Sequence, residues 1–287
     1  MKRLLYIQLS IFSIILGFSL SSCTKEIDFD YHDTAPLVIV EGRVSNEGMS
    51  VVITRSRNMN DSVKGRCLPG AVVTITSEGE AEQLIYDATA NSYRSTKAGV
   101  AGQTYHLSVD FEDCHYEATS QMLPPAPISS AEFLWMSILE ERLLAYEVWA
   151  VDPKPGERTH YLYRMDRHSS HPHLEGFSKT EPYRWSVFDD RGCPPGKVFV
   201  DVFCMSERAA DEDKEDDWED LLYEGDTITF SLMTIDRDVF EYFTSLRAGQ
   251  SGGANPRSNI SGGCQGYFAA MSITAADTLV YRPLPPK

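Results

Sequence analysis

Short runs in which hydrophobic and polar residues alternate cover most of the chain from residue 37 onward. Within residues 104–109, Tyr105, Leu107 and Val109 fall on one face, which is the pattern of a half-buried β-strand. The number and spacing of these alternating runs predict a small β-sandwich of immunoglobulin or transthyretin type over residues 36–121. The seven runs, separated by turn residues, are 37–44, 51–55, 71–76, 83–86, 92–95, 104–109 and 116–120.

The second half repeats this pattern with more aromatic residues and adds one helix. After Asp236, which we expect to cap it, Val239, Tyr242 and Phe243 recur at helical spacing, so this stripe is interpreted as core packing. The elements predict a larger β-sandwich or barrel-like domain with one packed helix over residues 129–287. Its expected strands are 131–137, 142–151, 160–166, 184–188, 198–203, 227–235, 266–274 and 279–281.

A proline-rich segment separates the two halves. Pro124, Pro125 and Pro127 lie close together, and such a segment favours a stiff, extended connector. We therefore place the domain boundary at residues 122–128.

The first twenty-three residues have the pattern of a lipoprotein export signal. Lys2 and Arg3 precede an apolar run over residues 4–20, and small residues lead to Cys23, as in a bacterial lipobox. A membrane-spanning anchor is the alternative, but the run is short of the roughly 20 residues that a spanning helix needs. We predict a signal peptide over residues 1–22 and lipidation of Cys23, which would anchor the protein in a membrane.

The segment that follows Cys23 is polar and acidic. Residues 23–35 are interpreted as a tether between the lipid and the first strand. Residues 23–28 are similar to the acidic signal that sends some lipoproteins of Bacteroidota to the cell surface, and an ordinary solvated linker is the alternative.

The charge of the chain limits its partners. It carries 26 basic and 42 acidic residues, a formal net charge of -16. This excess of negative charge argues against nucleic acid as a partner. It also disfavours direct adsorption to anionic lipids, so membrane attachment should depend on the lipid at Cys23.

Five cysteines follow Cys23, and export implies an oxidising compartment in which they can pair. Cys193 and Cys204 flank the turn residues 194–196, so the first expectation is a disulfide between these two, and Cys67 with Cys114 is the second. Spacing alone does not fix the connectivity.

Two segments have the residue types of a reactive site. Residues 249–253 match the G-x-S-x-G nucleophile elbow, but a helix precedes them and no helix follows, so we interpret them as a flexible linker. His168, His171 and His173 have a spacing that suits zinc or copper. Their serine- and proline-containing surroundings favour a surface loop, and we predict no metal or other cofactor.

Residues 255–268 resemble the C-terminal signature of the domain of unknown function 4249 family of Bacteroidota lipoproteins. Further similarities lie at residues 40–42, 69–71, 102–105 and 116–120, and the pair 264–265 departs from the family pattern. In the signature, Asn259, Gly262, Gly263 and Gly266 favour a turn that folds back and fixes where the last strand begins, ahead of Tyr267 and Phe268. The resemblance implies an envelope lipoprotein, beside TonB-dependent outer-membrane receptors, and brings no catalytic residues.

These observations lead to one preferred function and two alternatives. We expect a noncatalytic, lipid-anchored outer-membrane protein on the cell surface that assists a TonB-dependent nutrient receptor by binding or docking. A structural or adhesive envelope component is the first alternative. A hydrolase whose site has no recognised motif is the second.

Overall fold

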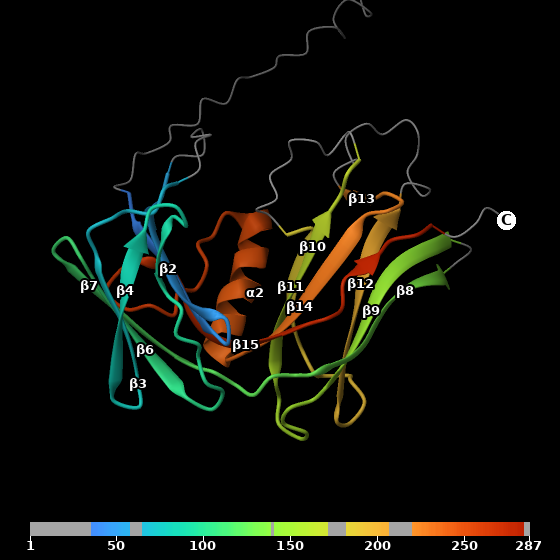
Figure 1. Cartoon of the computed structure of the whole chain (residues 1–287), viewed down its shortest axis with the longest axis horizontal. Helices are drawn as coiled ribbons and strands as arrows, with labels where there is room; N and C mark the ends of the chain where they lie inside the picture. Colours follow the sequence, from blue (N-terminus) through green and yellow to red (C-terminus); the bar gives the residue numbers. More distant parts are fainter. Residues whose placement is uncertain (1–35, 58–64, 139–140, 172–181, 207–219, 284–287) are drawn as a thin grey trace, which may run out of the picture. The chain divides into compact units, whose positions relative to one another are not determined.

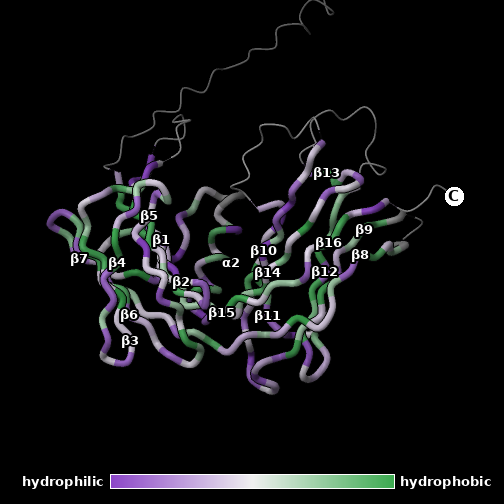
Figure 2. Tube along the Cα trace, viewed as in Figure 1, coloured by the Kyte–Doolittle hydropathy of each residue, from purple (hydrophilic) through white to green (hydrophobic). Residues whose placement is uncertain are grey.

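The computed structural model describes residues 36–57, 65–138, 141–171, 182–206 and 220–283. The predicted signal peptide, Cys23 and the acidic tether lie outside these residues. Figure 1 shows the arrangement of the strands and of the helix α2 (Arg237–Gly252). In Figure 2, apolar residues follow the strands, and the turns that join them are mainly hydrophilic.

The first half contains the seven predicted strands. They follow one another in the sheet in the order β1-β2-β5-β4-β3-β6-β7. Several strands are longer than expected, because the ladder hydrogen bonds continue into the tight turns that join neighbouring strands. Their bounds are β1 Val38–Ser45, β2 Gly48–Arg55, β3 Val72–Ser77, β4 Glu80–Asp87, β5 Ser92–Ser95, β6 Thr104–Phe111 and β7 Cys114–Gln121.

The second half is built from two sheets and a helix. One sheet has the order β13-β12-β9-β8, and in the other β11, β10, β14 and β15 are neighbours, with β16 beside β14. The short strand β13 (Leu221–Leu222) was not predicted; it is defined by its parallel pairing with Met205 and Ser206 of β12. The other bounds are β8 Ile128–Ile138, β9 Glu141–Val151, β10 His160–His168, β11 Arg184–Asp189, β12 Lys197–Ser206, β14 Thr227–Ile235, β15 Gln265–Ala275 and β16 Leu279–Val280.

Aromatic side chains fill the space between these two sheets. Tyr146 on β9 stacks on Phe230 of β14, with ring centroids 5.6 Å apart, and Tyr163 on β10 contacts the same ring. Helix α2 covers the opposite face of the β10-β14-β15 sheet, where Val239 packs with Ile235 and Met271. The chain is therefore mostly β, with sheets packed as a sandwich and one packed helix, as the alternation predicted.

Strand β15 belongs to the sheets of both halves. Residues Gln265 to Met271 pair in parallel with β1, and the end of the same strand pairs antiparallel with β14. Phe268 and Ala270 face the core of the first half, whereas Tyr267 and Ala269 face the helix side. Because side chains alternate along a strand, one element near the C-terminus contributes to two cores.

The proline-rich connector is held against this shared strand and its neighbour β14. Its carbonyl oxygens accept hydrogen bonds from three hydroxyl groups: Ser272 to Leu123, Thr234 to Pro124 and Thr274 to Ala126. Within it, Met122 and Ala126 are buried. The connector is extended and fixed to the sheet, and the proposed division into two domains at residues 122–128 stays a prediction.

The cysteine pairing expected from the sequence is not formed. All five cysteines among the described residues are unpaired. Cys193 lies in the turn before β12, whereas Cys204 is the eighth residue of that extended strand, so their Cα atoms are farther apart than the roughly 7 Å limit for a disulfide. The turn joins strands of different sheets, so its arms are not neighbours as in a hairpin. Cys67, which is buried, and Cys114, which is exposed, are both unpaired, so the second expected disulfide is not formed either.

The segment interpreted as a flexible linker is the last turn of α2. The helix continues through Gly252, and Gly253 ends it with φ 69° while its N–H donates to the Gly249 carbonyl at 2.8 Å. The linker interpretation of residues 249–252 was therefore wrong, because a helix can end on a left-handed glycine after a Gly-rich turn.

Candidate ligand-binding groove

Two neighbouring cavities lie on the outer face of β1, β2 and β15, and they share Arg43 and Tyr267 among their lining residues. The cavity over β1, β2 and β5 has a volume of about 380 Å³, and the one beside α2, β10 and β11 about 220 Å³. We call the two together the groove. Of the elements around it, β2, β15, β10, β11 and α2 are labelled in Figure 1, and β1 and β5 are labelled in Figure 2.

The floor of the first cavity carries a cross-strand row of polar residues. Strand register places Arg43 on β1 opposite Ser50 on β2, and Ser50 opposite Arg94 on β5. The Arg43 Nε donates to the Ser50 hydroxyl at 2.9 Å. Among the described residues, no carboxylate lies within ion-pair distance of either arginine, so this row presents two uncompensated guanidinium groups.

A second row contains Glu41 and Tyr267, which register places side by side on β1 and β15. The Glu41 side chain is accessible to solvent, but surrounding protein raises the pKa of its carboxyl group. Burial also raises the pKa of the Tyr267 hydroxyl; Glu41 and Tyr242 push it the same way, and Arg43 opposes them. The Tyr267 hydroxyl therefore stays protonated at physiological pH and can donate a hydrogen bond.

Aromatic residues line the second cavity. Phe243 on α2 contacts Tyr267 with ring centroids 4.9 Å apart, and Trp185 on β11 meets Phe243 edge to face at 5.8 Å. Leu162 and Met271 add aliphatic surface. Arg164 also lines this cavity, but Asp166 neutralises it through an ion pair of 2.7 Å. This end of the groove is therefore apolar in character.

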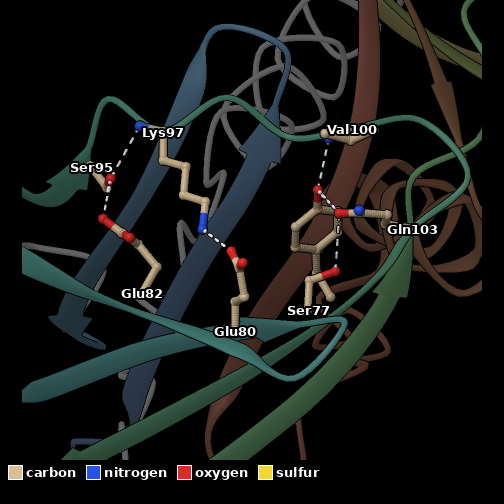
Figure 3. Close-up of polar contacts among 8 residues, drawn as sticks. Ser77, Glu80, Glu82, Ser95, Lys97, Val100 and Gln103 are labelled. Atoms are coloured by element: carbon tan, nitrogen blue, oxygen red, sulfur yellow. Dashed lines mark hydrogen bonds and ion pairs between the residues drawn. The ribbon is translucent and has the colours of Figure 1, made fainter.

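A third hollow, of about 210 Å³, lies in the first half beside β3 and β4. Figure 3 shows that its polar side chains point at one another. Lys97 Nζ lies 3.0 Å from Glu80, the Ser95 hydroxyl donates to Glu82, and the Ser77 hydroxyl donates to Gln103. Since these groups are already hydrogen-bonded, this hollow is better suited to holding the turns in place than to binding a ligand.

The family model described as "Domain of unknown function (DUF4249)" matches residues 24–276, most of the sequence. The chain belongs to this family. No curated protein matches it. Among solved structures it is similar to the selenomethionine-substituted chicken interferon gamma receptor alpha chain, with 7% identity, 70% of this chain and 90% of that chain covered, and a TM-score of 0.20. That TM-score is too low to support any conclusion.

The signature of this DUF4249 protein forms a turn that starts β15. Asn259 clamps Phe268, because its amide nitrogen donates to the Phe268 carbonyl at 2.8 Å and its amide oxygen accepts from the Phe268 N–H at 2.9 Å. Ser261 bonds through its N–H and its hydroxyl to the Glu117 carbonyl on β7. The loop thus folds back onto the first half and sets the register of β15.

Two glycines of the signature have no room for a side chain. A Cβ at Gly262 would lie 2.2 Å from the His115 carbonyl oxygen, and one at Gly266 would lie 2.0 Å from the Val40 carbonyl oxygen. Both have positive φ, 95° and 113°, as does Gly263 at 88° in open space. These residues therefore have a conformational role, and of the signature only Tyr267 also lines the groove.

The histidines suggested by spacing do not form a described metal site. His168 ends β10, and the His171 ring stacks on Tyr223 with centroids 3.7 Å apart. His173 lies outside the described residues. Among the residues that the structure describes, no group of three or more histidine, cysteine, aspartate or glutamate side chains is arranged to hold a metal ion.

Sequence reasoning did not single out Arg43, Arg94 or Trp185 as site residues. Arg43 alternates with buried residues along β1, and Arg94 is an exposed residue of the short strand β5, so the local pattern indicates only a solvent-facing side. Their proximity depends on the pairing of β2 with both strands, which no local pattern encodes. Tyr267 was noted, but as part of the signature turn.

Proposed function

We propose that this protein is a noncatalytic, ligand-binding lipoprotein of the cell envelope, anchored in the outer membrane through Cys23 and assisting a TonB-dependent nutrient receptor from the cell surface. The observation that carries the proposal is the groove, in which two arginines without an ion-pair partner line one cavity and aromatic side chains line the neighbouring one. A concave site with a few polar groups beside apolar surface is typical of small-molecule binding.

The sequence supplies the cellular part of the proposal. The lipobox ending at Cys23 and the acidic residues after it support lipid anchoring and surface display. Within the described part of the chain, no helix combines the length and apolarity needed to cross a membrane.

Lipid attachment is tested by metabolic labelling with a palmitate analogue in the native host. We expect label on the wild-type chain and none on Cys23→Ala, which should also leave the membrane fraction. Equal labelling of both proteins would show that Cys23 is not the lipidated residue.

Receptor assistance is tested by isolating the tagged full chain from membranes in a mild detergent. We expect a TonB-dependent receptor to be enriched over a control lipoprotein carrying the same tag. Absence of any such receptor, with normal nutrient growth but impaired surface attachment of a deletion strain, would favour the structural or adhesive alternative instead.

A further inference from the structure

We propose that the groove binds organic anions in which a carboxylate is joined to a flat, apolar ring system. This inference rests on the proposed function only in taking the groove as the ligand site, and it needs neither the membrane anchor nor a receptor. Three features carry it: the arginine pair, the aromatic wall and the position of Arg43 and Tyr267 between the two cavities.

The arginine row provides the anion-binding end. Arg43 and Arg94 lie on either side of Ser50, two strand spacings apart, or roughly 10 Å between Cα atoms. The flexible side chains can converge from this separation on one carboxylate, and the fork of a guanidinium group matches a carboxylate with two parallel hydrogen bonds. The bond from Arg43 to Ser50 already directs one guanidinium group along the row.

The charge of the groove favours an anion within an acidic protein. Of the ionisable residues lining the two cavities, Arg43 and Arg94 are unpaired, Arg164 is neutralised by Asp166, and Glu41 is the single carboxylate. The groove thus carries a local excess of positive charge, while the whole chain has a net charge of -16. Such a local reversal of sign concentrates anions at the site.

The second cavity provides the ring-binding end. Trp185, Phe243 and Tyr267 line a space of about 220 Å³ that shares Arg43 with the cavity over the arginine row. Aromatic side chains bind planar rings through stacked or edge contacts. A ligand therefore has to be amphipathic to use the whole groove, with its charge at one end and its ring at the other.

The test uses the full chain in phosphatidylcholine nanodiscs and isothermal titration calorimetry with three probes: indole-3-propionate, its neutral amide and propionate. We expect saturable binding of indole-3-propionate, at least tenfold tighter than either of the other two. Equal binding of the acid and the amide, or of the acid and propionate, would overturn the proposal, as would no binding of any probe.

Matched variants assign the site. Arg43→Gln and Arg94→Gln should each weaken binding of indole-3-propionate at least tenfold, and Trp185→Ala should weaken it without changing the binding of propionate. Arg191→Gln removes the same charge from an exposed arginine outside the groove and should leave binding unchanged. Equal losses in Arg191→Gln and Arg43→Gln would show nonspecific attraction and contradict the proposal.

Two controls keep the results interpretable. Thermal unfolding of each variant checks that it is folded, and Arg43→Lys, which keeps the charge but not the fork, should bind with intermediate affinity. If the probes bind and no receptor is isolated with the protein, the ligand class stands and the receptor proposal fails. If a receptor is isolated and no probe binds, the receptor proposal stands and the ligand class fails.

Discussion

At the scale of single residues, the close approach of two backbones determines how the signature turn positions β15, and charge determines which ligands the groove can bind. Gly266 allows β15 to lie against β1 at Val40, which positions Tyr267 beside Glu41. The glycines of the signature were predictable as turn residues from the sequence. Their contacts were not, because the opposing carbonyl groups belong to strands more than 100 residues earlier.

Gly266→Ala should destabilise the protein strongly. The added Cβ meets the Val40 carbonyl oxygen and the backbone is held at positive φ, so we expect a loss of at least ~2 kcal/mol in the free energy of unfolding. Gly263→Ala is the matched control, since its φ is also positive but nothing lies within 4 Å, and should cost about 1 kcal/mol. Urea unfolding measures both, and equal losses would contradict the packing argument.

Glu41 should make anion binding dependent on pH. Its pKa is raised above the ordinary 4.5 by burial, so its negative charge disappears as the pH falls through the raised value, and repulsion of an anion disappears with it. In the wild type, binding of indole-3-propionate should tighten as the pH falls through the raised pKa of Glu41, and it should not change over the same range in Glu41→Gln. A wild-type profile that is flat, or that weakens toward low pH, would exclude this role.

The same shift predicts a change in stability. Because the folded state binds this proton more tightly than the unfolded chain, the contribution of Glu41 to stability is greatest below the ordinary pKa of 4.5 and is lost as the pH rises through the raised value. Glu41→Gln should therefore raise the melting temperature at pH 7.5 and have a smaller effect at pH 4. Thermal unfolding of both proteins at both pH values measures the direction of the change in melting temperature.

At the scale of elements, helix α2 is fixed to the first half of the chain through its N-cap. Asp236 accepts a hydrogen bond from the Val239 N–H at 2.9 Å, which is the expected cap, and also from the Ser120 hydroxyl at 2.5 Å and the Gln121 N–H at 3.1 Å. Ser120 in turn accepts from the Ala270 N–H on β15. The cap was predictable from sequence; the link to β7 and β15 was not.

Asp236→Ala should therefore cost more than an ordinary cap. Losing the cap removes about 1 kcal/mol, and leaving the buried Ser120 hydroxyl without this acceptor adds roughly 1 kcal/mol or more. Asp238→Ala, an exposed carboxylate in the first turn, is the control and should cost less than about 1 kcal/mol. Equal effects in guanidinium unfolding would show that the contact with β7 adds nothing.

At the scale of the whole molecule, β15 makes the two halves depend on one another. Phe268 is fully buried in the core of the first half, while Met271 on the same strand packs under α2. The groove exists only where β15 brings the outer face of β1 and β2 beside α2, β10 and β11. Stability and the candidate site thus depend on the same element.

A fragment of residues 36–127 should not fold on its own. Without β15, the outer edge of β1 is unpaired and the first core lacks Phe268 and Ala270. We expect no cooperative thermal transition by circular dichroism, whereas the full chain should show a single transition. A cooperative transition in the fragment would show that the first half is an independent domain and that the predicted boundary holds.

Local patterns were sufficient to predict almost all of the strands and the packed helix, because the two-residue period of a strand and the 3.6-residue period of a helix are both visible in the sequence. The N-terminal pattern likewise predicts lipidation at Cys23, since a lipobox is a contiguous signal. Tertiary structure alone decided which strands became neighbours. The parallel pairing of β1 with β15, the row of Arg43, Ser50 and Arg94, and the absence of the expected disulfide all depend on contacts between residues distant in the chain, which no local pattern specifies.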